Sequence, residues 1–263
     1  MAGTVLITGS AGTVGRDLRA GLRGRHGLLR LLDRAPQEPA LDAAEEIVTA
    51  DIGDEDALVA AMEGVDAVVH LAGIPVDAPF DAIATANLIG TQRVFDAARR
   101  AGVGRVVFAS SHHAGGFYPR THVQRVTDLP RPDSHYGVSK LFGEAVARLY
   151  HDKHGIEAAC LRIQSWTDRP TVHRHLGSWL SPRDGVELVH RCLEVERLGF
   201  AIVFGVSANT RAWVRNEDLG WLGWEPQDDA ERFAAELEPP ASPTAADLLD
   251  GAEYVERDYD PEF

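Results

Sequence analysis

The feature that most constrains the fold is a regular alternation of short apolar runs with amphipathic segments, which begins within the first ten residues. The apolar runs are Val5–Thr8, Leu28–Leu32, Ile47–Asp51, Ala67–Leu71, Arg105–Ser110, Ala158–Ile163 and Ala201–Val206. The amphipathic segments are Val14–Leu22, Asp54–Met62, Ala82–Arg100 and Tyr136–Lys153. Alternation of this kind is typical of a parallel sheet covered by helices on both faces. We therefore predict an α/β fold.

A glycine-rich loop directly follows the first apolar run and opens the first helical segment. It reads Gly9-Ser10-Ala11-Gly12-Thr13-Val14-Gly15. Glycines at this point permit a tight turn and let backbone amides approach a pyrophosphate at the helix N-terminus. The loop therefore predicts a dinucleotide site in a Rossmann-type, doubly wound parallel sheet. Its expected contacts are Gly9, Gly12, Thr13, Val14 and Gly15.

Two acidic residues at strand ends suggest which dinucleotide binds. Asp33 ends the second apolar run, about twenty residues after the glycines, where a carboxylate can accept hydrogen bonds from the adenosine ribose and repel a 2′-phosphate. The neighbouring Arg34 softens that repulsion, so NAD is favoured over NADP. Asp51 and Ile52 end the third run at a place suited to the adenine edge, although Asp51 could equally be the N-cap of the next helix.

A tyrosine and a lysine four residues apart indicate the chemistry. Tyr136 and Lys140 lie on one face of a predicted helix, and Ser110-Ser111 ends a predicted strand. A free phenol is a poor base at neutral pH, but a nearby ammonium group favours its deprotonated form. A serine hydroxyl at the strand end can hold a substrate oxygen beside that phenol. We therefore expect proton abstraction from a hydroxyl group by Tyr136.

Together these residues resemble the extended short-chain dehydrogenases, the NAD-dependent epimerase/dehydratase family. The turn His70–Gly73 and Asn87 also fall where that family has its motifs. More specific segments resemble those members that oxidise D-glucuronate or D-galacturonate at the anomeric carbon to an aldarolactone. These segments are Phe108–Ser111, Pro132–Lys140, Arg162–Ser165, Ser178–Ser181, Gly205–Asn209 and Leu222–Asp228. The resemblance extends to about residue 233.

The resemblance implies a role for each matching residue. Tyr136 would remove the proton of the anomeric hydroxyl, Ser111 would position that hydroxyl, and Lys140 would bind the nicotinamide ribose. Asn87 would hold a backbone kink and a water of the proton relay. Arg174 would bind the sugar carboxylate with its two-pronged guanidinium group. Further cofactor contacts would be Leu71, Ala72, Gly73 and Trp166, and further substrate contacts would be Pro75, His112, His113 and Ser165.

Four departures from the family pattern fall in the expected pocket. His112 stands where the family usually has asparagine, Pro75 replaces a serine, Gln164 replaces a glycine and Trp166 replaces a much smaller residue. Proline offers no side-chain donor and tryptophan occupies more volume. We therefore expect an intact catalytic apparatus with an altered preference among sugars.

Two other functions fit parts of the pattern. One is a nucleotide-sugar epimerase, dehydratase or ketoreductase of the same family, but such enzymes usually devote a longer C-terminal lobe to the nucleotide than the roughly 60 regular residues that follow Ser165. The other is a catalytically silent dinucleotide sensor, which the complete set of Ser111, Tyr136 and Lys140 argues against. We expect three segments: an NAD-binding core at 1–164, a small substrate-covering region with a late core strand at 165–233, and an acidic tail at 234–263.

Charge and composition narrow the possible partners. The net charge is −14, and residues 225–263 hold thirteen acids and two arginines, a net of −11, which leaves about −3 for the rest. No basic face for nucleic acid is visible, and no apolar run approaches the roughly 18 residues of a membrane helix. The acidic end is expected to be a solvated, loosely ordered tail, although its apolar residues Leu248, Leu249, Tyr254 and Phe263 could anchor it across the body of the protein.

The cysteines and histidines suggest neither a disulfide framework nor a metal site. Cys160 and Cys192 are expected to be reduced core thiols of a cytoplasmic protein. Histidine pairs such as His112-His113 lack a carboxylate or cysteine at a recognised metal-ligand spacing. By family analogy we expect a homo-oligomer that associates through the helices at Ala82–Arg100 and Tyr136–Lys153.

Overall fold

A seven-stranded parallel sheet forms the centre of the protein, in a computed structural model that describes residues 3–257. The strand order is β10-β7-β5-β4-β1-β2-β3. The strands are β1 (Thr4–Thr8), β2 (Leu28–Asp33), β3 (Glu45–Thr49), β4 (Ala67–His70), β5 (Arg105–Ser111), β7 (Glu157–Ile163) and β10 (Phe200–Gly205). The order reverses direction between β1 and β4, the point at which such sheets bind their ligands. The predicted doubly wound parallel sheet is confirmed.

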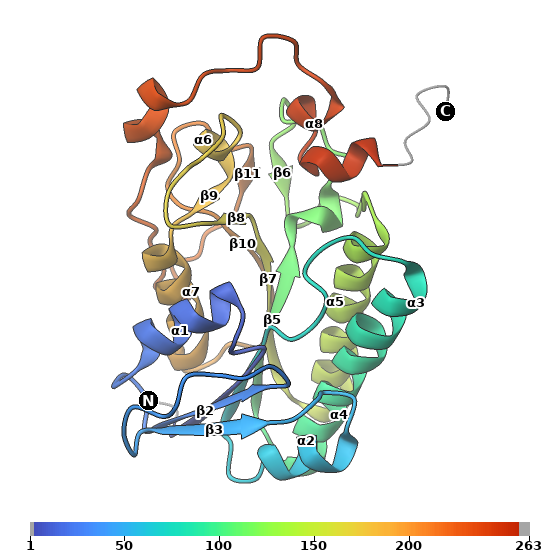
Figure 1. Cartoon of the computed structure of the whole chain (residues 1–263), viewed down its shortest axis with the longest axis vertical. Coiled ribbons are helices and arrows are strands. Elements are labelled where there is room, and N and C mark those ends of the chain that lie inside the picture. Colours follow the sequence, from blue (N-terminus) through green and yellow to red (C-terminus); the bar gives the residue numbers. More distant parts are fainter. Residues whose placement is uncertain (1–2, 258–263) are drawn as a thin grey trace.

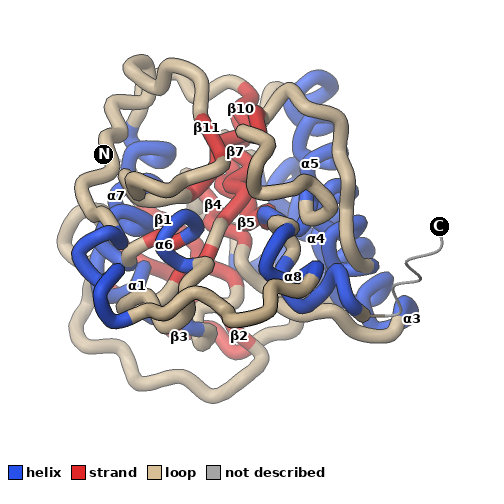
Figure 2. The backbone as a smooth tube through the Cα atoms, turned by 90° about the horizontal axis from the view of Figure 1, so that it is seen from above, coloured by secondary structure: helices blue, strands red, loops and turns tan. Residues whose placement is uncertain are grey.

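Helices cover both faces of this sheet (Figures 1 and 2). α1 (Thr13–Leu22) and α7 (Pro182–Glu194) lie on one face, and α2 (Glu55–Ala61), α4 (Gly90–Ala101) and α5 (His135–His154) lie on the other. Neighbouring residues of a strand point to opposite faces. Leu6 therefore packs with Phe95 of α4, whereas Ile7 packs with Val189 of α7. Burial on both faces explains why the strands read as continuous apolar runs.

The long helix expected at Ala82–Arg100 is interrupted. It consists of α3 (Phe80–Ile83), a π-helical segment at Ala84–Ile89 and α4. Asn87 lies in the π-helical segment, so the irregularity predicted at this residue is present. A π-helical segment within a helix widens one turn and commonly marks a functional site.

The region after Ser165 contributes more to the core than the sequence indicated. β8 (Ser165–Trp166) pairs with β9 (Trp179–Leu180), and β11 (Val214–Arg215) pairs with β6 (Gln124–Arg125). This region also contains α6 (His175–Ser178) and a 3-10 segment at Ala230–Glu236, and another 3-10 segment, at His112–Gly115, directly follows β5. The sequence-based prediction missed α7, although its start has an ordinary signal. Ser181 accepts a hydrogen bond from the Asp184 amide, and Pro182 occupies the first turn.

Residues 234–257 of the acidic segment lie partly against the body of the protein, the alternative that their apolar residues left open, rather than forming a solvated tail. The segment contains α8 (Ala245–Leu248) and a 3-10 segment at Ala252–Glu256. Asp250 is 0% exposed, and Tyr254 and Val255 are buried. Acidic composition predicted hydration, but the buried positions find hydrogen-bond donors and aromatic partners on the body of the protein. Leu248 is exposed, and Phe263 lies outside the described residues.

Both cysteines are buried and free, as expected. Within residues 3–257, no helix combines the length and the apolar character that crossing a membrane requires.

The contact between α5 and β5 leads to a stability prediction. A Cβ atom at Gly143 would lie 2.2 Å from Cζ of Phe108 on β5. Although alanine favours a helix, we expect Gly143→Ala to destabilise the protein by about 1–3 kcal/mol, because the ring and helix must separate. Urea unfolding would measure this. Gly104→Ala is the matched control, because its Cβ would meet no atom within 4 Å. Equal stability of the two variants would contradict the close contact.

Candidate functional site

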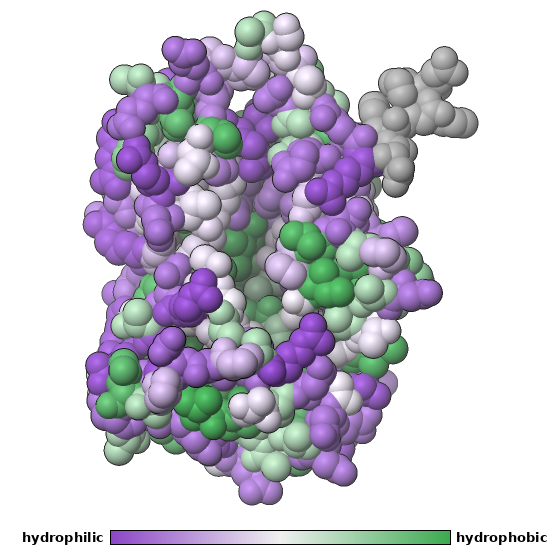
Figure 3. Space-filling model, in the orientation of Figure 1, coloured by the Kyte–Doolittle hydropathy of each residue, from purple (hydrophilic) through white to green (hydrophobic). Residues whose placement is uncertain are grey.

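A cavity of about 570 Å³ lies at the carboxyl ends of the central strands. Figure 3 shows the protein hollowed at the centre of this face. The sequence-predicted residues that line the cavity are Gly9, Gly12, Thr13, Val14, Gly15, Asp33, Asp51, Ile52, Leu71, Ala72, Gly73, Pro75, Ser111, His112, His113, Tyr136 and Lys140. Asn87, Ser165, Trp166 and Arg174 do not belong to its lining. Most of the predicted site is therefore one connected space.

The glycine loop lies so close to neighbouring backbone that side chains are excluded. Gly9 has φ +76°, and a Cβ atom there would lie 2.7 Å from the backbone nitrogen of Ala72. At Gly15 a Cβ atom would lie 2.5 Å from the Gly9 carbonyl oxygen. Gly12 is the N-cap of α1 and provides no side-chain cap, so the first amides of the helix can receive a phosphate. This geometry fits a dinucleotide pyrophosphate.

Asp33 is held at the cavity wall by two backbone amides. Its Oδ2 accepts from the Ala11 amide at 3.0 Å and its Oδ1 accepts from the Ala35 amide at 2.9 Å. The carboxylate is thereby fixed beside the glycine loop, where the ribose of a dinucleotide would lie. Both oxygens retain capacity for further hydrogen bonds.

Asp51 lines the same end of the cavity and is not a helix cap. Its Oδ1 accepts from the Gly53 amide at 2.7 Å, and its Oδ2 lies 3.5 Å from Nη1 of Arg34. The N-cap of α2 is Asp54, which accepts from the Ala57 amide. Of the two alternatives for Asp51, the helix cap is wrong.

Tyr136 and Lys140 lie together near the start of α5. Nζ of Lys140 is 5.3 Å from the centroid of the Tyr136 ring and donates to the carbonyl oxygen of Ala109 at 2.8 Å. Burial raises the pKa of Tyr136 above its ordinary value, and a hydrogen bond with Ser111 opposes that rise. Burial also lowers the pKa of Lys140 to about 8. The buried phenol therefore needs a neighbouring cation to lose its proton, and Lys140 is in position to provide it.

The two serines at the end of β5 have different surroundings. Ser111 hydrogen-bonds with Tyr136, whereas Ser110 donates to Oε1 of Glu144 at 2.6 Å. Arg162 of β7 donates to both oxygens of Glu144 at 2.9 Å. All of these residues are buried. Ser110 thus ties β5 to α5 and β7, a role the sequence-based prediction missed although Glu144 and Arg162 are charged residues within buried segments.

Asn87 supports the wall of the cavity from behind. Its Oδ1 accepts from the Ile74 amide at 2.8 Å, and its Nδ2 donates to the Ile74 carbonyl at 3.0 Å and to the Ser139 hydroxyl at 3.1 Å. These bonds fix the loop that carries Gly73 and Pro75 against the π-helical segment. Asn87 therefore positions backbone near the cavity and does not face it.

Arg174 and Ser165 form a pair beyond the lining of the cavity. Nη1 of Arg174 donates to the Ser165 hydroxyl at 3.1 Å, and Nη2 donates to the backbone carbonyl of Asp250 at 3.1 Å. The buried Nε of Arg174 has no hydrogen-bond partner within residues 3–257. Burial lowers the pKa of Arg174, and the charges of Asp250 and Glu253 oppose that change. The guanidinium group thus retains donor capacity close to the substrate end of the site.

Trp166 is directed away from the cavity. Its indole Nε1 donates to Oδ2 of Asp17 on α1 at 2.7 Å, and a Cβ atom at Gly185 would overlap its ring. The Trp166 side chain therefore does not line the cavity, and the cofactor contact expected of this residue stays a prediction. The large side chain instead joins α1 to α7.

The C-terminal segment lies against the substrate end of the site, and Tyr254, one of its expected apolar anchors, makes the contact. The ring of Tyr254 stacks on His113 with centroids 4.1 Å apart, and Nδ1 of His113 lies 2.7 Å from Oδ2 of Asp133. Burial and the charge of His112 lower the pKa of His113 to about 4, although Asp133 opposes the change. His113 is therefore neutral near pH 7. Asp250 and Tyr254 are the site residues that sequence reasoning missed.

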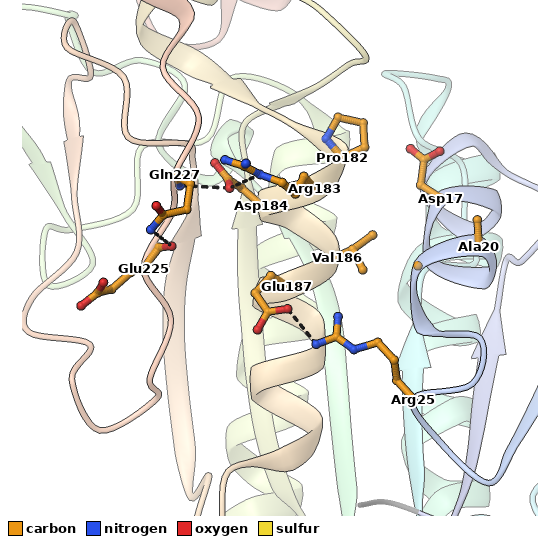
Figure 4. A pocket seen from close by; sticks show the side chains of 11 residues that line it. Asp17, Ala20, Arg25, Pro182, Arg183, Asp184, Val186, Glu187, Glu225 and Gln227 are labelled. Carbon is orange, nitrogen blue, oxygen red and sulfur yellow. Dashed lines mark hydrogen bonds and ion pairs between the residues drawn. The ribbon is translucent and has the colours of Figure 1, made fainter.

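A second cavity of about 610 Å³ lies between α1 and α7 (Figure 4). It contains none of the sequence-predicted site residues, and its charged side chains largely pair with one another. Arg25 bonds to Glu187 at 2.8 Å, and Arg183 lies 3.5 Å from Asp184. Although slightly larger, it lacks the glycine loop and the group formed by Ser111, Tyr136 and Lys140. The chemistry therefore belongs to the cavity at the strand ends.

One group of side chains has metal-ligand character. His26, His190 and Glu194 converge at the amino end of β2. Nε2 of His26 lies 3.4 Å from Nδ1 of His190, and Nδ1 of His26 lies 3.5 Å from Glu194. Such contacts also suit a hydrogen-bonded chain without an ion, and the group is remote from the cavity. The sequence-based prediction considered other histidine pairs and missed this one.

Comparisons with known proteins agree with this geometry. The sequence model of the NAD dependent epimerase/dehydratase family matches residues 5–177. A uronate dehydrogenase of Agrobacterium fabrum is 44% identical over 92% of this chain and 92% of its own length. An NAD-dependent glucose-6-phosphate dehydrogenase of Haloferax volcanii is 40% identical over 89% of this chain and 97% of its own length.

A solved structure extends the similarity to the whole fold. A mutant uronate dehydrogenase of Agrobacterium tumefaciens, complexed with NAD, superposes with a TM-score of 0.92 at 42% identity, and covers 99% of this chain and 98% of that chain. From its sequence model, its relatives and its fold, this chain belongs to the NAD-dependent epimerase/dehydratase family.

Proposed function

We propose that this protein is an NAD-dependent dehydrogenase that oxidises a uronic acid, of the D-glucuronate or D-galacturonate type, at the anomeric carbon to an aldarolactone. The observation that carries the proposal is the convergence of Ser111, Tyr136 and Lys140 on the cavity that contains the glycine loop. The relatives named uronate dehydrogenase support the substrate class.

The proposed cofactor is NAD, and the residues of the cavity fit it. Gly9, Gly12, Thr13, Val14 and Gly15 would receive the pyrophosphate, and Asp33 would receive the adenosine ribose. Asp51 and Ile52 would border the adenine, while Leu71, Ala72 and Gly73 would line the opposite wall. NAD, when bound, accepts the hydride that leaves the anomeric carbon.

Tyr136 would act as the general base for the anomeric hydroxyl. Ser111 hydrogen-bonds with Tyr136 and would hold the substrate oxygen next to it. Lys140 would stabilise negative charge on the phenol oxygen through space, because its Nζ lies 5.3 Å from the centroid of the same ring. Asn87 would keep the loop at Ile74 in place and support a water-mediated proton relay through the π-helical segment.

Arg174 and Ser165 would recognise the sugar carboxylate and hydroxyls. The free Nε of Arg174 supports this role, because a buried guanidinium donor without a partner favours an anionic ligand. Pro75, His112 and His113 would complete the sugar pocket. The C-terminal segment closes the site around Tyr254, which favours a small sugar acid over a nucleotide sugar.

We further propose a cytoplasmic homo-oligomer made of an NAD-binding core at 1–164, a substrate-covering region at 165–233 and the acidic segment at 234–263. α7 and β10 of the second segment complete the layers of the core sheet. Exposed apolar side chains on the outer helices support self-association, namely Ile89, Val138 and Leu149. The buried free thiols of Cys160 and Cys192 support a reducing compartment.

The first prediction concerns the base. Tyr136→Phe should lower turnover at least ~100-fold, the usual scale of general acid–base catalysis, and leave NAD affinity nearly intact. NADH absorbance with D-glucuronate and D-galacturonate measures turnover, and fluorescence titration measures NAD binding. Turnover within a few-fold of wild type would remove Tyr136 from the mechanism.

The second prediction concerns cofactor choice. Wild type should prefer NAD over NADP, because the Asp33 carboxylate repels a 2′-phosphate. Asp33→Ala should narrow that preference, as measured by kcat/KM with each cofactor. Arg34→Ala is the matched control and should leave NAD preference intact or increase it. An unchanged ratio in Asp33→Ala would contradict the assignment.

The third prediction concerns the carboxylate. Arg174→Ala should raise KM for a uronate far more than for a neutral aldose, because only the uronate loses an ionic partner. Arg174→Lys keeps the charge without the planar fork and should give an intermediate KM. Glucose 6-phosphate is tested in the same assay as an anionic sugar that carries a phosphate in place of the carboxylate. Equal losses on uronates and neutral aldoses would exclude the carboxylate contact.

A further inference from the structure

Asp250 is a buried carboxylate that the proposed mechanism does not use. It is 0% exposed. Its Oδ1 accepts from the Trp213 indole at 2.8 Å and its Oδ2 accepts from the Gln124 amide at 2.9 Å. Its backbone amide donates to the Tyr118 carbonyl at 3.0 Å. Both donors to the carboxylate are neutral, so a charged Asp250 requires a cation nearby.

The imidazole of His112 lies against this carboxylate. Nδ1 of His112 is 3.6 Å from Oδ1 of Asp250, and it is buried. Arg174 donates to the backbone carbonyl of Asp250 and not to its side chain. Burial raises the pKa of Asp250, but the charge of the nearby His112, the hydrogen bond from Trp213 and the charge of Arg174 outweigh burial and lower that pKa overall. Asp250 is therefore an ionised carboxylate facing His112.

His112 also lines the catalytic cavity next to Ser111. With Nδ1 directed at Asp250, Nε2 is the ring nitrogen left to face the cavity. This orientation resembles the arrangement in which a carboxylate fixes one imidazole nitrogen so that the other can act on a ligand. The neighbouring His113 does not share this role, because Asp133 holds its Nδ1 and Tyr254 covers its ring.

Other charged or titratable groups surround the pair. His113 stacks on His112 with centroids 4.0 Å apart. Three of these groups, Asp133, Tyr136 and Lys140, lie within or just before α5. Arg174 and His175 lie at the start of α6, and the remaining neighbours are Arg120, Glu253 and Tyr254. Arg120 donates to the Leu249 and Ala246 carbonyls, so it is occupied by the C-terminal segment. Asp250 is the carboxylate in contact with His112.

We propose that Asp250 is a positioning residue that holds His112 as an imidazolium, with its Nε2–H directed into the sugar pocket. The proposal rests on the dehydrogenase function proposed above and deepens it. A doubly protonated imidazole only donates hydrogen bonds, so it selects a sugar oxygen that accepts, above all a carboxylate oxygen. His112 and Arg174 would then be two cationic donors for one carboxylated sugar. The C-terminal segment thereby determines specificity as well as closure.

The test compares the pH profiles of kcat and kcat/KM for a uronate in four forms of the full chain: wild type, Asp250→Asn, His112→Asn and the double variant. In wild type, kcat/KM should fall at alkaline pH as His112 loses its proton. Asp250→Asn should shift this fall to lower pH by about one unit, because the stabilising carboxylate charge is gone. It should also raise KM near pH 7.5 by at least ~10-fold, the scale of one charge-assisted hydrogen bond, with kcat within a few-fold.

The His112→Asn variant distinguishes an effect of Asp250 on the His112 imidazole from a general loss of folded structure. His112→Asn should remove this alkaline fall, because an amide donates without titrating, and adding Asp250→Asn should then produce no further shift. Glu256→Gln is the matched control in the same segment, because Glu256 is exposed and accepts from the Ala246 amide within that segment. It should leave both profiles unchanged. Thermal unfolding of each variant reports any loss of structure.

Two outcomes would overturn the proposal. One is an alkaline fall that persists in His112→Asn, and the other is an effect of Asp250→Asn that is as large in the His112→Asn background as in wild type. NMR titration of the His112 ring gives a measurement independent of activity, and its midpoint should lie at higher pH in wild type than in Asp250→Asn. If wild type oxidises no uronate, the proposed function fails, whereas the NMR comparison still decides the pairing of Asp250 with His112.

Discussion

The packing of α5 against β5 is the constraint on which the rest of the site depends. Gly143 lets the helix approach the Phe108 ring, and the Ser110–Glu144–Arg162 network joins the helix to two strands. A buried ion pair of this kind is stable only when both charges and their hydrogen bonds are retained. The register it imposes brings the phenol of Tyr136 beside the hydroxyl at the end of β5. Catalytic geometry is thus a consequence of core packing.

The substrate end of the site depends on contacts between distant parts of the chain. The segment around Asp250 bonds to Gln124, Trp213 and Arg174, which come from three separate regions of the sequence. A segment that closes over a site reduces access of water and strengthens electrostatic interactions inside it. The same contacts leave donor capacity on Arg174. The proposed recognition of an anionic sugar would therefore depend on the C-terminal segment as well as on the sheet.

Local patterns predicted the sheet and the cofactor side of the site well. The seven strands were located to within about two residues because each is buried on both faces and reads as an apolar run. The glycine loop was recognisable because backbone contacts at Gly9 and Gly15 exclude any other residue. The surroundings of Trp166 and the buried position of Asp250 could not be predicted in this way. Trp166 bonds to Asp17, and Asp250 bonds across the fold, so neither partner is visible in the local sequence.

The sequence by itself determined the parallel sheet, the dinucleotide loop and the pairing of Tyr136 with Lys140, since each depends on spacing along one strand, turn or helix. Only the tertiary structure decided that His112 meets Asp250, that His113 stacks on Tyr254 and that Arg174 keeps a donor with no partner among residues 3–257. These contacts join residues far apart in the chain, and their energies depend on burial. Burial is a property of the packed fold, and it determines here which charges face the substrate.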